Sequence, residues 1–402
     1  MSTTLPRGLR ANLLRPSKGT SGSTRAHRVS FIELFFDLVF VFALTQLNQV
    51  VAGIDSPESA VVAIVLLLAV WWLWMNTTWA TNWLDPQYLA VRVSIIVLAF
   101  AGITVSVSVQ EADGDRALAF AIAYVALQLV RSLAMVAATA RHDAAGADDF
   151  RRMSLWFAFS GVFWIAGALL GGTVLVVLWV IAITLDYVGA SLSYRTPMLG
   201  RGNLERWDLS AEHIAERASL FVLIALGETF LVTGFAFVAE DLTLGTALAL
   251  VSAFLSAAAM WWFYFDHSEW WGERRLKKVA ETGAVARSAY AYAHVIIIGG
   301  IILIGVADKL IVGEPDTWST IALVSIIVGP ILYLVGCAIF RRIVGAPNPL
   351  VAVVAAFGIL ALTPLALITS PVIVSLSCTA VLIAAAVVDT VLRVRRGDGS
   401  RG

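Results

Sequence analysis

Twelve long blocks of apolar residues follow one another along the chain, and each is about long enough to cross a membrane as a helix. About 20 helical residues span the ~30 Å hydrocarbon core of a bilayer. We expect helices because hydrocarbon offers the backbone no other hydrogen-bond partner. The predicted spans are 31–52, 59–81, 88–110, 117–139, 153–171, 173–194, 214–238, 242–266, 289–312, 317–341, 350–369 and 371–393. The short breaks at Gly171-Gly172 and Ser370-Pro371 leave open whether the flanking spans merge or re-enter.

Composition supports a membrane protein. Of the 402 residues, 59% are hydrophobic and 14% are charged, whereas a soluble domain is roughly 45–50% apolar and ~25% charged. Twelve spans leave no room for a soluble catalytic domain. The apolar residues form continuous blocks and not the alternating segments of a membrane β-barrel. We therefore predict an all-α, polytopic bundle of about 12 transmembrane helices in a lipid bilayer.

The distribution of charge predicts the orientation. The net charge is zero, which gives no reason to expect a nucleic-acid partner. If the N-terminus is cytoplasmic, 24 of the 28 Lys and Arg residues fall in cytoplasmic segments, as the positive-inside rule requires. Acidic residues then dominate the outer loops, and we place Asp308 among them. We predict that both termini are cytoplasmic.

The first block carries Glu33 and Asp37 and is too long for the apolar core of a cleaved signal peptide. The two cysteines, Cys337 and Cys378, fall inside apolar blocks and resemble small core residues.

Three pairs of segments suggest an internal duplication. Trp71–Asn76 matches Trp261–Asp266, and Tyr88–Arg92 matches Tyr290–His294, at offsets of 190 and 202 residues. Ile183-Thr-Leu-Asp186 parallels Ala386-Val-Val-Asp389 at an offset of 203. Two parallel six-helix copies are typical of carriers whose halves rock about a central site. Aromatic belts that recur without shared ancestry would explain the same matches. The predicted parts are a basic tail 1–30, a first half 31–200, a second half 201–394 and a tail 395–402.

Charged residues within the spans are the candidate site residues, because each costs roughly 2.5–3.5 kcal/mol to insert without a partner. Glu33 and Asp37 share one helix face, and their repulsion calls for a nearby cation. Arg92, Arg131, Arg217 and His294 are the candidates for it. Glu228 lies near the middle of its span and is the deepest carboxylate, which favours a proton or cation site. Interhelical ion pairs that lock the bundle are the alternative for the others. The candidate ion- or substrate-binding residues are Glu33, Asp37, Arg92, Asp186, Arg217, Glu228, Asp266, His294 and Asp389.

Signatures of soluble enzymes are absent. The chain contains no Walker-type phosphate loop, no G-x-S-x-G elbow and no H-E-x-x-H motif. The stretch Asp266-His267-Ser268-Glu269 offers metal-ligand types without a helical spacing that would bring them together. We expect neither enzymatic activity nor a metal or cofactor, with an embedded hydrolase or metal enzyme as a minor alternative.

Four motifs resemble a known family. The run from Val29 to Leu47, with Glu-Leu-Phe-Phe-Asp at its centre, resembles the opening signature of the bacterial low-temperature-requirement protein A family. Glu216–Thr229 resembles its second signature, and Trp261–Asp266 and Tyr292–His294 resemble a third and a fourth. The similarity weakens after about residue 320. The resemblance implies a multi-pass protein of the bacterial cell membrane and does not imply a substrate.

These observations favour a carrier, coupled to protons or cations, that moves a small solute. Glu228 would be the coupling site, and Glu33 and Asp37 would line the cytoplasmic mouth together with His294 and Arg92. This hypothesis requires that the buried ionisable side chains meet in one hydrated pocket. The alternatives are an ion channel, a membrane-state sensor, or a regulatory protein that docks on a partner through small residues such as Gly167 and Gly171.

Overall fold

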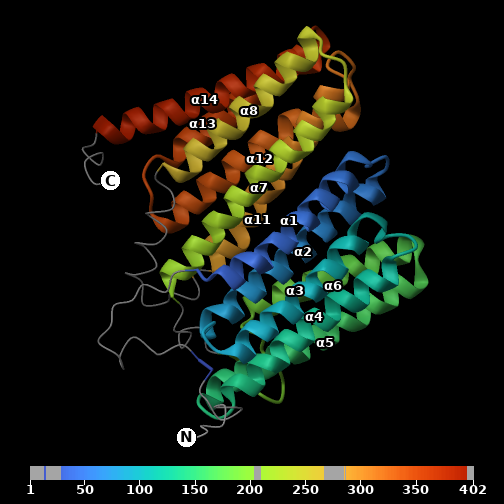
Figure 1. Ribbon diagram of the computed structural model, residues 1–402, viewed down its shortest axis with the longest axis vertical. Coiled ribbons are helices and arrows are strands. Elements are labelled where there is room, and N and C mark those ends of the chain that lie inside the picture. Colours follow the sequence, from blue (N-terminus) through green and yellow to red (C-terminus); the bar gives the residue numbers. More distant parts are fainter. Residues whose placement is uncertain (1–12, 15–28, 203–209, 267–284, 286, 396–402) are drawn as a thin grey trace, which may run out of the picture.

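The computed structural model describes residues 13–14, 29–202, 210–266, 285 and 287–395 of the chain. This part of the chain is helical and contains no β-strand. Twelve of its helical segments are long and apolar enough to cross a membrane, which confirms the predicted all-α bundle. Successive spans run in opposite directions (Figure 1).

The first six spans begin and end close to their predicted boundaries, with one exception at α5. Their bounds are α1 Phe31–Ala52, α2 Pro57–Trp83, α3 Leu89–Ser108 with the short η1 Val109–Glu111, α4 Ala117–Thr139, α5 Ala144–Leu170 and α6 Gly172–Ser191.

The last six spans include a π-helical stretch and a short 3₁₀ helix. Their bounds are α7 Ala211–Ala239, α8 Leu244–Phe265, η3 Arg287–Ala293 (the π-helical stretch) continued by α11 His294–Gly313, α12 Thr320–Val344, α13 Pro349–Ala361 with η4 Thr363–Leu367, and α14 Pro371–Arg395.

Both short hairpins join separate helices. Gly171 and Gly172 have φ values of +68° and +54°, a conformation that glycine adopts without steric cost, so α5 ends there and α6 begins. Pro371 opens α14, where its missing N–H is harmless. Neither pair of spans merges.

The exception is α5, which starts nine residues before the predicted position 153. Its first turns carry charges that we expected to lie outside the helix. Arg151 pairs with Asp148 and Arg152 pairs with Asp149, each at 2.6 Å. Such i,i+3 pairs stabilise a helix that extends beyond the hydrocarbon region.

The helices form two groups that meet along a central interface. Figure 1 shows α1–α6 in blue to green and α7–α14 in yellow to red on opposite sides of the molecule. Helices α1 and α2 contact α7 and α11 across this interface. The most buried spans are also there, since 72% of the apolar window of α2 and 78% of that of α11 are buried. The core therefore lies between the two groups.

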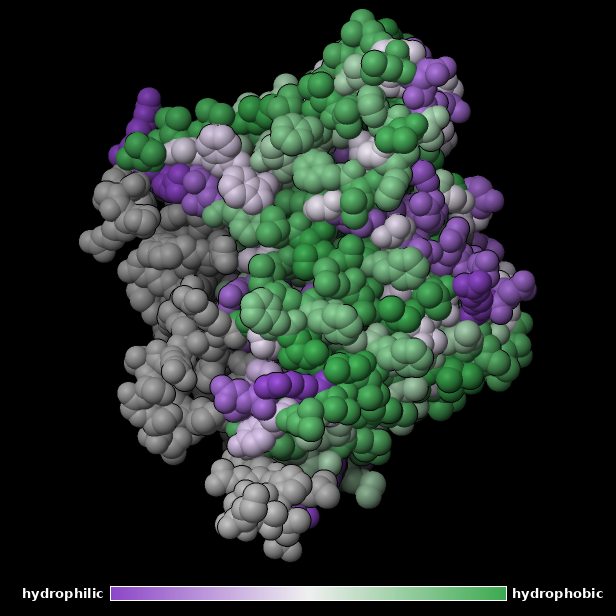
Figure 2. Space-filling model, viewed as in Figure 1, coloured by the Kyte–Doolittle hydropathy of each residue, from purple (hydrophilic) through white to green (hydrophobic). Residues whose placement is uncertain are grey.

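The outer surface is apolar between the helix ends. Phe100, Phe235 and Phe357 are 74%, 76% and 68% exposed. In Figure 2, hydrophobic residues cover most of the visible face, and hydrophilic residues gather toward the edges where helices end. Such a surface is suited to a lipid bilayer. The internal repeat and the cytoplasmic position of the termini stay predictions.

Candidate functional site

The first part of the site is a pair of carboxylates on α1. Glu33 and Asp37 are one helical turn apart, and their exposed fractions are 1% and 0%. Ser30 ends the preceding segment and donates to Glu33 Oε2 from its backbone nitrogen (2.9 Å) and its hydroxyl (2.7 Å). This capping box holds the Glu33 side chain at the start of the helix. Trp74 of α2 donates its indole N–H to Asp37 Oδ1 at 2.7 Å.

Arg217 of α7 is the cation that meets this pair. Its Nη2 forms an ion pair with Asp37 Oδ1, and its Nη1 lies 3.7 Å from Glu33 Oε1. Nη1 also donates to the hydroxyl of Thr81 on α2 at 3.1 Å. Of the four cations that the sequence offered, the structure therefore places Arg217 with the carboxylates. Arg217 is fully buried, so the ion pair is formed away from solvent.

His213 completes this cluster and was not among the predicted site residues. Its Nε2 lies 2.8 Å from Glu33 Oε1. Asn82 accepts the backbone N–H of Ser210 at 2.9 Å, so the amide nitrogen of Asn82 faces His213 Nδ1 at 3.1 Å. His213 Nδ1 is therefore the acceptor, and its Nε2–H donates to Glu33. The predicted span began one residue later, although His213 lies four residues before Arg217 on the same helix face.

The cluster keeps two buried polar atoms without hydrogen-bond partners. These are Oδ2 of Asp37 and Nε of Arg217. Buried polar atoms are nearly always satisfied in folded proteins, so an unpaired acceptor and an unpaired donor on the two residues of one ion pair are notable. They are where a water or a polar ligand would find partners.

The second part of the site surrounds Glu228, close to the middle of the α7 span. Glu228 is 3% exposed, and the hydroxyl of Thr45 on α1 donates to its Oε1. Asn48 follows one turn after Thr45, and its Oδ1 has no hydrogen-bond partner. A Cβ at Gly305 of α11 would lie 3.3 Å from this oxygen, so α1, α7 and α11 meet there. No ion pair among the described residues includes Glu228.

An aromatic layer separates these two parts. Phe221 lies one turn beyond Arg217 and is 1% exposed. Its ring centroid is 4.2 Å from that of Trp74 and 5.7 Å from that of Trp71. Arg217 and Glu228 are eleven residues apart, which is about 16 Å along the helix axis. The polar groups on either side therefore do not touch directly.

Polar side chains thus recur along the contact between α1 and α7, which we name the polar seam. On the far side of Asn48, Lys309 of α11 donates to Gln49 of α1 at 2.7 Å. The seam joins the two groups of helices along most of their length. It consists of Glu33, Asp37, Thr45 and Asn48 on α1 and His213, Arg217 and Glu228 on α7.

Three other predicted carboxylates lie outside the seam. Asp186 accepts hydrogen bonds from Ser160 (2.5 Å), Tyr124 (2.8 Å) and Trp164 (3.3 Å), all neutral donors. Asp389 pairs with Arg341 at 3.0 Å. Asp266 pairs with Arg393 and accepts the Thr390 hydroxyl at 2.9 Å. Asp389 and Asp266 thus each form an ion pair with an arginine, which is the alternative that the sequence left open for these residues.

Arg92 and His294 do not contact the carboxylate pair. The structure therefore does not contain the cytoplasmic mouth that we predicted from these residues together with Glu33 and Asp37. Arg92 is exposed on the first turn of α3 and donates to the carbonyl of Pro86 at 2.7 Å. His294 is buried against α8, where its Nε2 lies 2.7 Å from the hydroxyl of Tyr264 and its Nδ1 2.8 Å from the carbonyl of Ala289. The predicted residues therefore occupy several separate clusters and do not share one pocket. The predicted spans indicate how deep each residue lies in the membrane, but not which face of its helix packs against a neighbouring helix.

Among the described residues, no group of three or more His, Cys, Asp or Glu side chains is arranged to hold a metal ion. Asp266 is described, whereas His267, Ser268 and Glu269 lie outside the described residues. The seam itself offers carboxylate, amide and hydroxyl oxygens with one imidazole and one guanidinium. Such groups can exchange protons or hold small hard cations.

Comparison with known proteins agrees with these motifs. The model of a family described as bacterial low temperature requirement A protein (LtrA) matches residues 28–387. An uncharacterized protein of Rhizobium meliloti (strain 1021) is 36% identical over 323 residues, which cover 80% of this chain and 79% of that protein. The family match includes the whole polar seam, since the seam lies within residues 33–228.

Proposed function

The chain belongs to the bacterial low temperature requirement A family, and on this premise we propose that it is a proton- or cation-coupled carrier of a small solute. Its moving parts would be the two six-helix groups. The predicted residues do not meet in the one pocket that the carrier hypothesis first required, so the proposal is narrowed to a path along the polar seam between the two groups. The proposal places the carrier in the bacterial cell membrane.

One observation carries the proposal: the buried polar side chains of the seam lie where the two groups of helices meet. A charged side chain inside a membrane is costly, and by default it points to an ion pathway or a proton relay. A protein that only needed stability would gain little from a buried pair such as Asp37 and Arg217, because the cost of desolvation offsets the attraction. A seam that opens to water, in contrast, does need polar side chains along its walls.

The packing of the two groups supports a repeat. In the first group α1 contacts α3 and α4 contacts α5, and in the second α7 contacts α11 and α12 contacts α13. Nη1 of Arg131 lies 3.5 Å from the carbonyl oxygen of Leu73, and Nη2 of Arg341 lies 2.8 Å from that of Phe263. Leu73 and Phe263 occupy matching positions of the two tryptophan-rich segments. Parallel repeats of this kind are found in carriers that rock about a central site.

Glu228 would serve as the coupling carboxylate. In one state its charge is compensated by a proton or a cation, with the Thr45 hydroxyl as a further ligand. The Arg217–Asp37 pair and the aromatic layer at Phe221 would close the seam toward the end of the bundle at which α1 begins. Rocking of the two groups would break these contacts and expose Glu228 to that side. The solute would bind beside Glu228, where the Asn48 oxygen is unpaired.

Transport by the purified protein tests the proposal. Proteoliposomes that hold a pH-sensitive or a Na⁺-sensitive dye receive the corresponding inward proton or Na⁺ gradient, and panels of amino acids, sugars and small amines are added. We expect at least one solute to change the rate at which the gradient decays. Glu228→Gln should abolish this effect. Glu240→Gln is the matched control, because Glu240 lies exposed at the end of the same helix, and it should keep the rate within about twofold of the unmodified protein.

Other outcomes would contradict the carrier. If no solute responds to either gradient and Glu228→Gln leaves every measured rate unchanged, the proposal fails. Unitary currents in planar bilayers would favour the channel alternative. The docking alternative loses one of its surfaces, because a Cβ on Gly167 would lie 2.7 Å from the Trp179 ring, so this small residue packs inside the bundle.

A further inference from the structure

Another buried carboxylate lies away from the seam, within the group α7–α14. Asp308 lies in the last turns of α11 and is 4% exposed. We counted it among the outer-loop acids, although the predicted span 289–312 includes position 308, and the structure places it buried within α11 and not in a loop. Its Oδ2 has no hydrogen-bond partner. No ion pair among the described residues includes Asp308.

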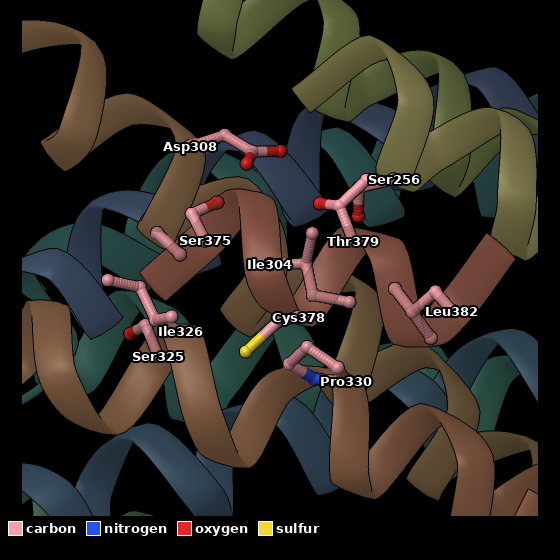
Figure 3. Close-up of a pocket in the computed structure, with 11 residues that line it drawn as sticks. Ser256, Ile304, Asp308, Ser325, Ile326, Pro330, Ser375, Cys378, Thr379 and Leu382 are labelled. Carbon is pink, nitrogen blue, oxygen red and sulfur yellow. The ribbon is translucent and has the colours of Figure 1, made fainter. Parts of the chain in front are cut away.

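Asp308 lines a small pocket together with other residues of α11 and with residues of α8, α12 and α14 (Figure 3). The cavity has a volume of about 10 Å³, which corresponds to roughly one water-sized sphere. A solute molecule cannot enter it, and neither can a hydrated ion. The pocket is therefore large enough for one water or one bare ion.

The polar atoms around this pocket are hydroxyl groups from three helices. They belong to Ser256 of α8, Ser325 of α12, and Ser375 and Thr379 of α14. The hydroxyl of Ser325 is fully buried and has no partner. Ser375 and Thr379 share the hydroxyl of Ser252 at 2.9 and 3.1 Å. Together with Asp308, the pocket holds one carboxylate and several neutral oxygens.

The nearest cation in the sequence does not compensate the charge. Lys309 follows Asp308 directly, but its Nζ donates to Gln49 on α1 at 2.7 Å. An unpaired buried carboxylate needs either a proton or a cation to neutralise it. Oxygen ligands are those that hard cations prefer. One carboxylate matches a single positive charge, and Mg²⁺ would demand several waters for which the cavity has no room.

We infer that this pocket binds one dehydrated Na⁺ ion, with Asp308 as the charged ligand and the surrounding hydroxyls as neutral ligands. The site lies within one group of helices and shares no residue with the polar seam. It therefore does not rest on the proposed carrier function. Such an ion would tie α11 and α12 to α8 and α14.

Thermal unfolding of the purified full-length protein in detergent tests this inference. The unfolding temperature is followed by tryptophan fluorescence while NaCl replaces choline chloride at constant ionic strength. We expect a saturable rise with Na⁺, because a ligand that binds only the folded state stabilises it. In the Glu228→Gln variant, which lacks the proposed coupling carboxylate of the seam, radioactive ²²Na⁺ should bind at one ion per chain, and K⁺ should compete at least tenfold more weakly.

Three variants separate the outcomes. Asp308→Asn, made in the Glu228→Gln background, should remove the response to Na⁺ and the bound ²²Na⁺. Ser325→Ala removes a hydroxyl that contacts no other polar group in the described structure, so it should leave unfolding in choline unchanged and weaken Na⁺ binding several-fold. Glu228→Gln alone should still show a saturable rise of the unfolding temperature with Na⁺, whether or not it transports, which keeps this test distinct from that of transport.

The inference is overturned if the unmodified protein shows no stabilisation by Na⁺ up to about half-molar salt. It is also overturned if Asp308→Asn or Ser325→Ala binds ²²Na⁺ as tightly as the unmodified protein. Should Asp308→Asn fail to fold, Ser325→Ala alone decides the result.

Discussion

At the scale of residues, Arg217 is central, because it joins carboxylates of one helix group to the other. Glu33 and Asp37 come from α1, and Arg217 comes from α7. Asp37 also accepts the indole N–H of Trp74, whose ring lies 5.8 Å from the guanidinium carbon of Arg217. The aromatic ring excludes water and adds a weak cation–π attraction.

Removal of this guanidinium should destabilise the fold strongly. Arg217→Met leaves two buried carboxylates without a cation, which costs about 3–5 kcal/mol. The free energy of unfolding in mixed detergent and SDS micelles measures the loss. A second substitution, Asp37→Asn, should recover part of it because it removes one of the unpaired charges. Arg92→Met is the control and should have no measurable effect, since Arg92 is exposed; equal effects of the two Met variants would contradict a dry charge cluster.

The residue types of the site could be predicted from sequence, but their partners could not. The i,i+4 spacing of Glu33 and Asp37 identifies a shared face and the need for a cation. Which of four cations supplies it depends on how α7 lies against α1, and no local pattern encodes that. His213 and Asp308 were misplaced for a related reason. Each lies near a helix end, where charge suggests water and only packing decides burial.

At the scale of elements, glycines allow α11 and α12 to pack closely against each other. A Cβ on Gly300 would lie 2.5 Å from the backbone nitrogen of Tyr333 and 2.8 Å from the carbonyl oxygen of Gly329. Gly336 makes a similar approach to the backbone of Ile297. Small residues let membrane helices approach closely where no hydrophobic force distinguishes a helix from lipid. The apolar lengths predicted these two helices, but not which faces would touch.

Gly300→Ala should therefore force the two helices apart. The neighbouring atoms are backbone and cannot rotate away, so we expect a loss of about 1–3 kcal/mol in the free energy of unfolding. Gly234→Ala in α7 is the matched control, because a Cβ added at Gly234 would meet no neighbouring atom within 4 Å. It should be neutral or stabilising by up to ~1 kcal/mol through helix propensity. Similar effects of the two substitutions would contradict the close α11–α12 contact.

At the scale of the whole molecule, the interface between the two helix groups is the part expected to move. This interface contains both apolar contacts and the polar seam. The overall bundle could be predicted because hydrocarbon requires long apolar helices. Their arrangement around the interface depends on contacts between segments almost 200 residues apart, such as Glu33 with His213.

A cross-link between the groups should stop transport. Gln49 of α1 and Lys309 of α11 touch across the interface, so Gln49→Cys and Lys309→Cys can be joined by a short bifunctional thiol reagent. The native Cys337 and Cys378 are buried and should react little. We expect loss of gradient-driven flux on linking and its return when the linker is reduced. Full flux in the linked protein would contradict a rocking motion, and each single Cys variant treated alike is the control.

Carrier function depends most directly on whether water reaches the middle of the seam from both sides of the membrane. Thr45→Cys places a thiol beside Glu228, and a membrane-impermeant thiol reagent is applied to vesicles of each orientation. We expect the thiol to react from either side, and an imposed proton or Na⁺ gradient to shift the balance between them. Labelling from neither side, at the rate of the buried Cys337, would contradict an opening seam and with it the proposal of transport.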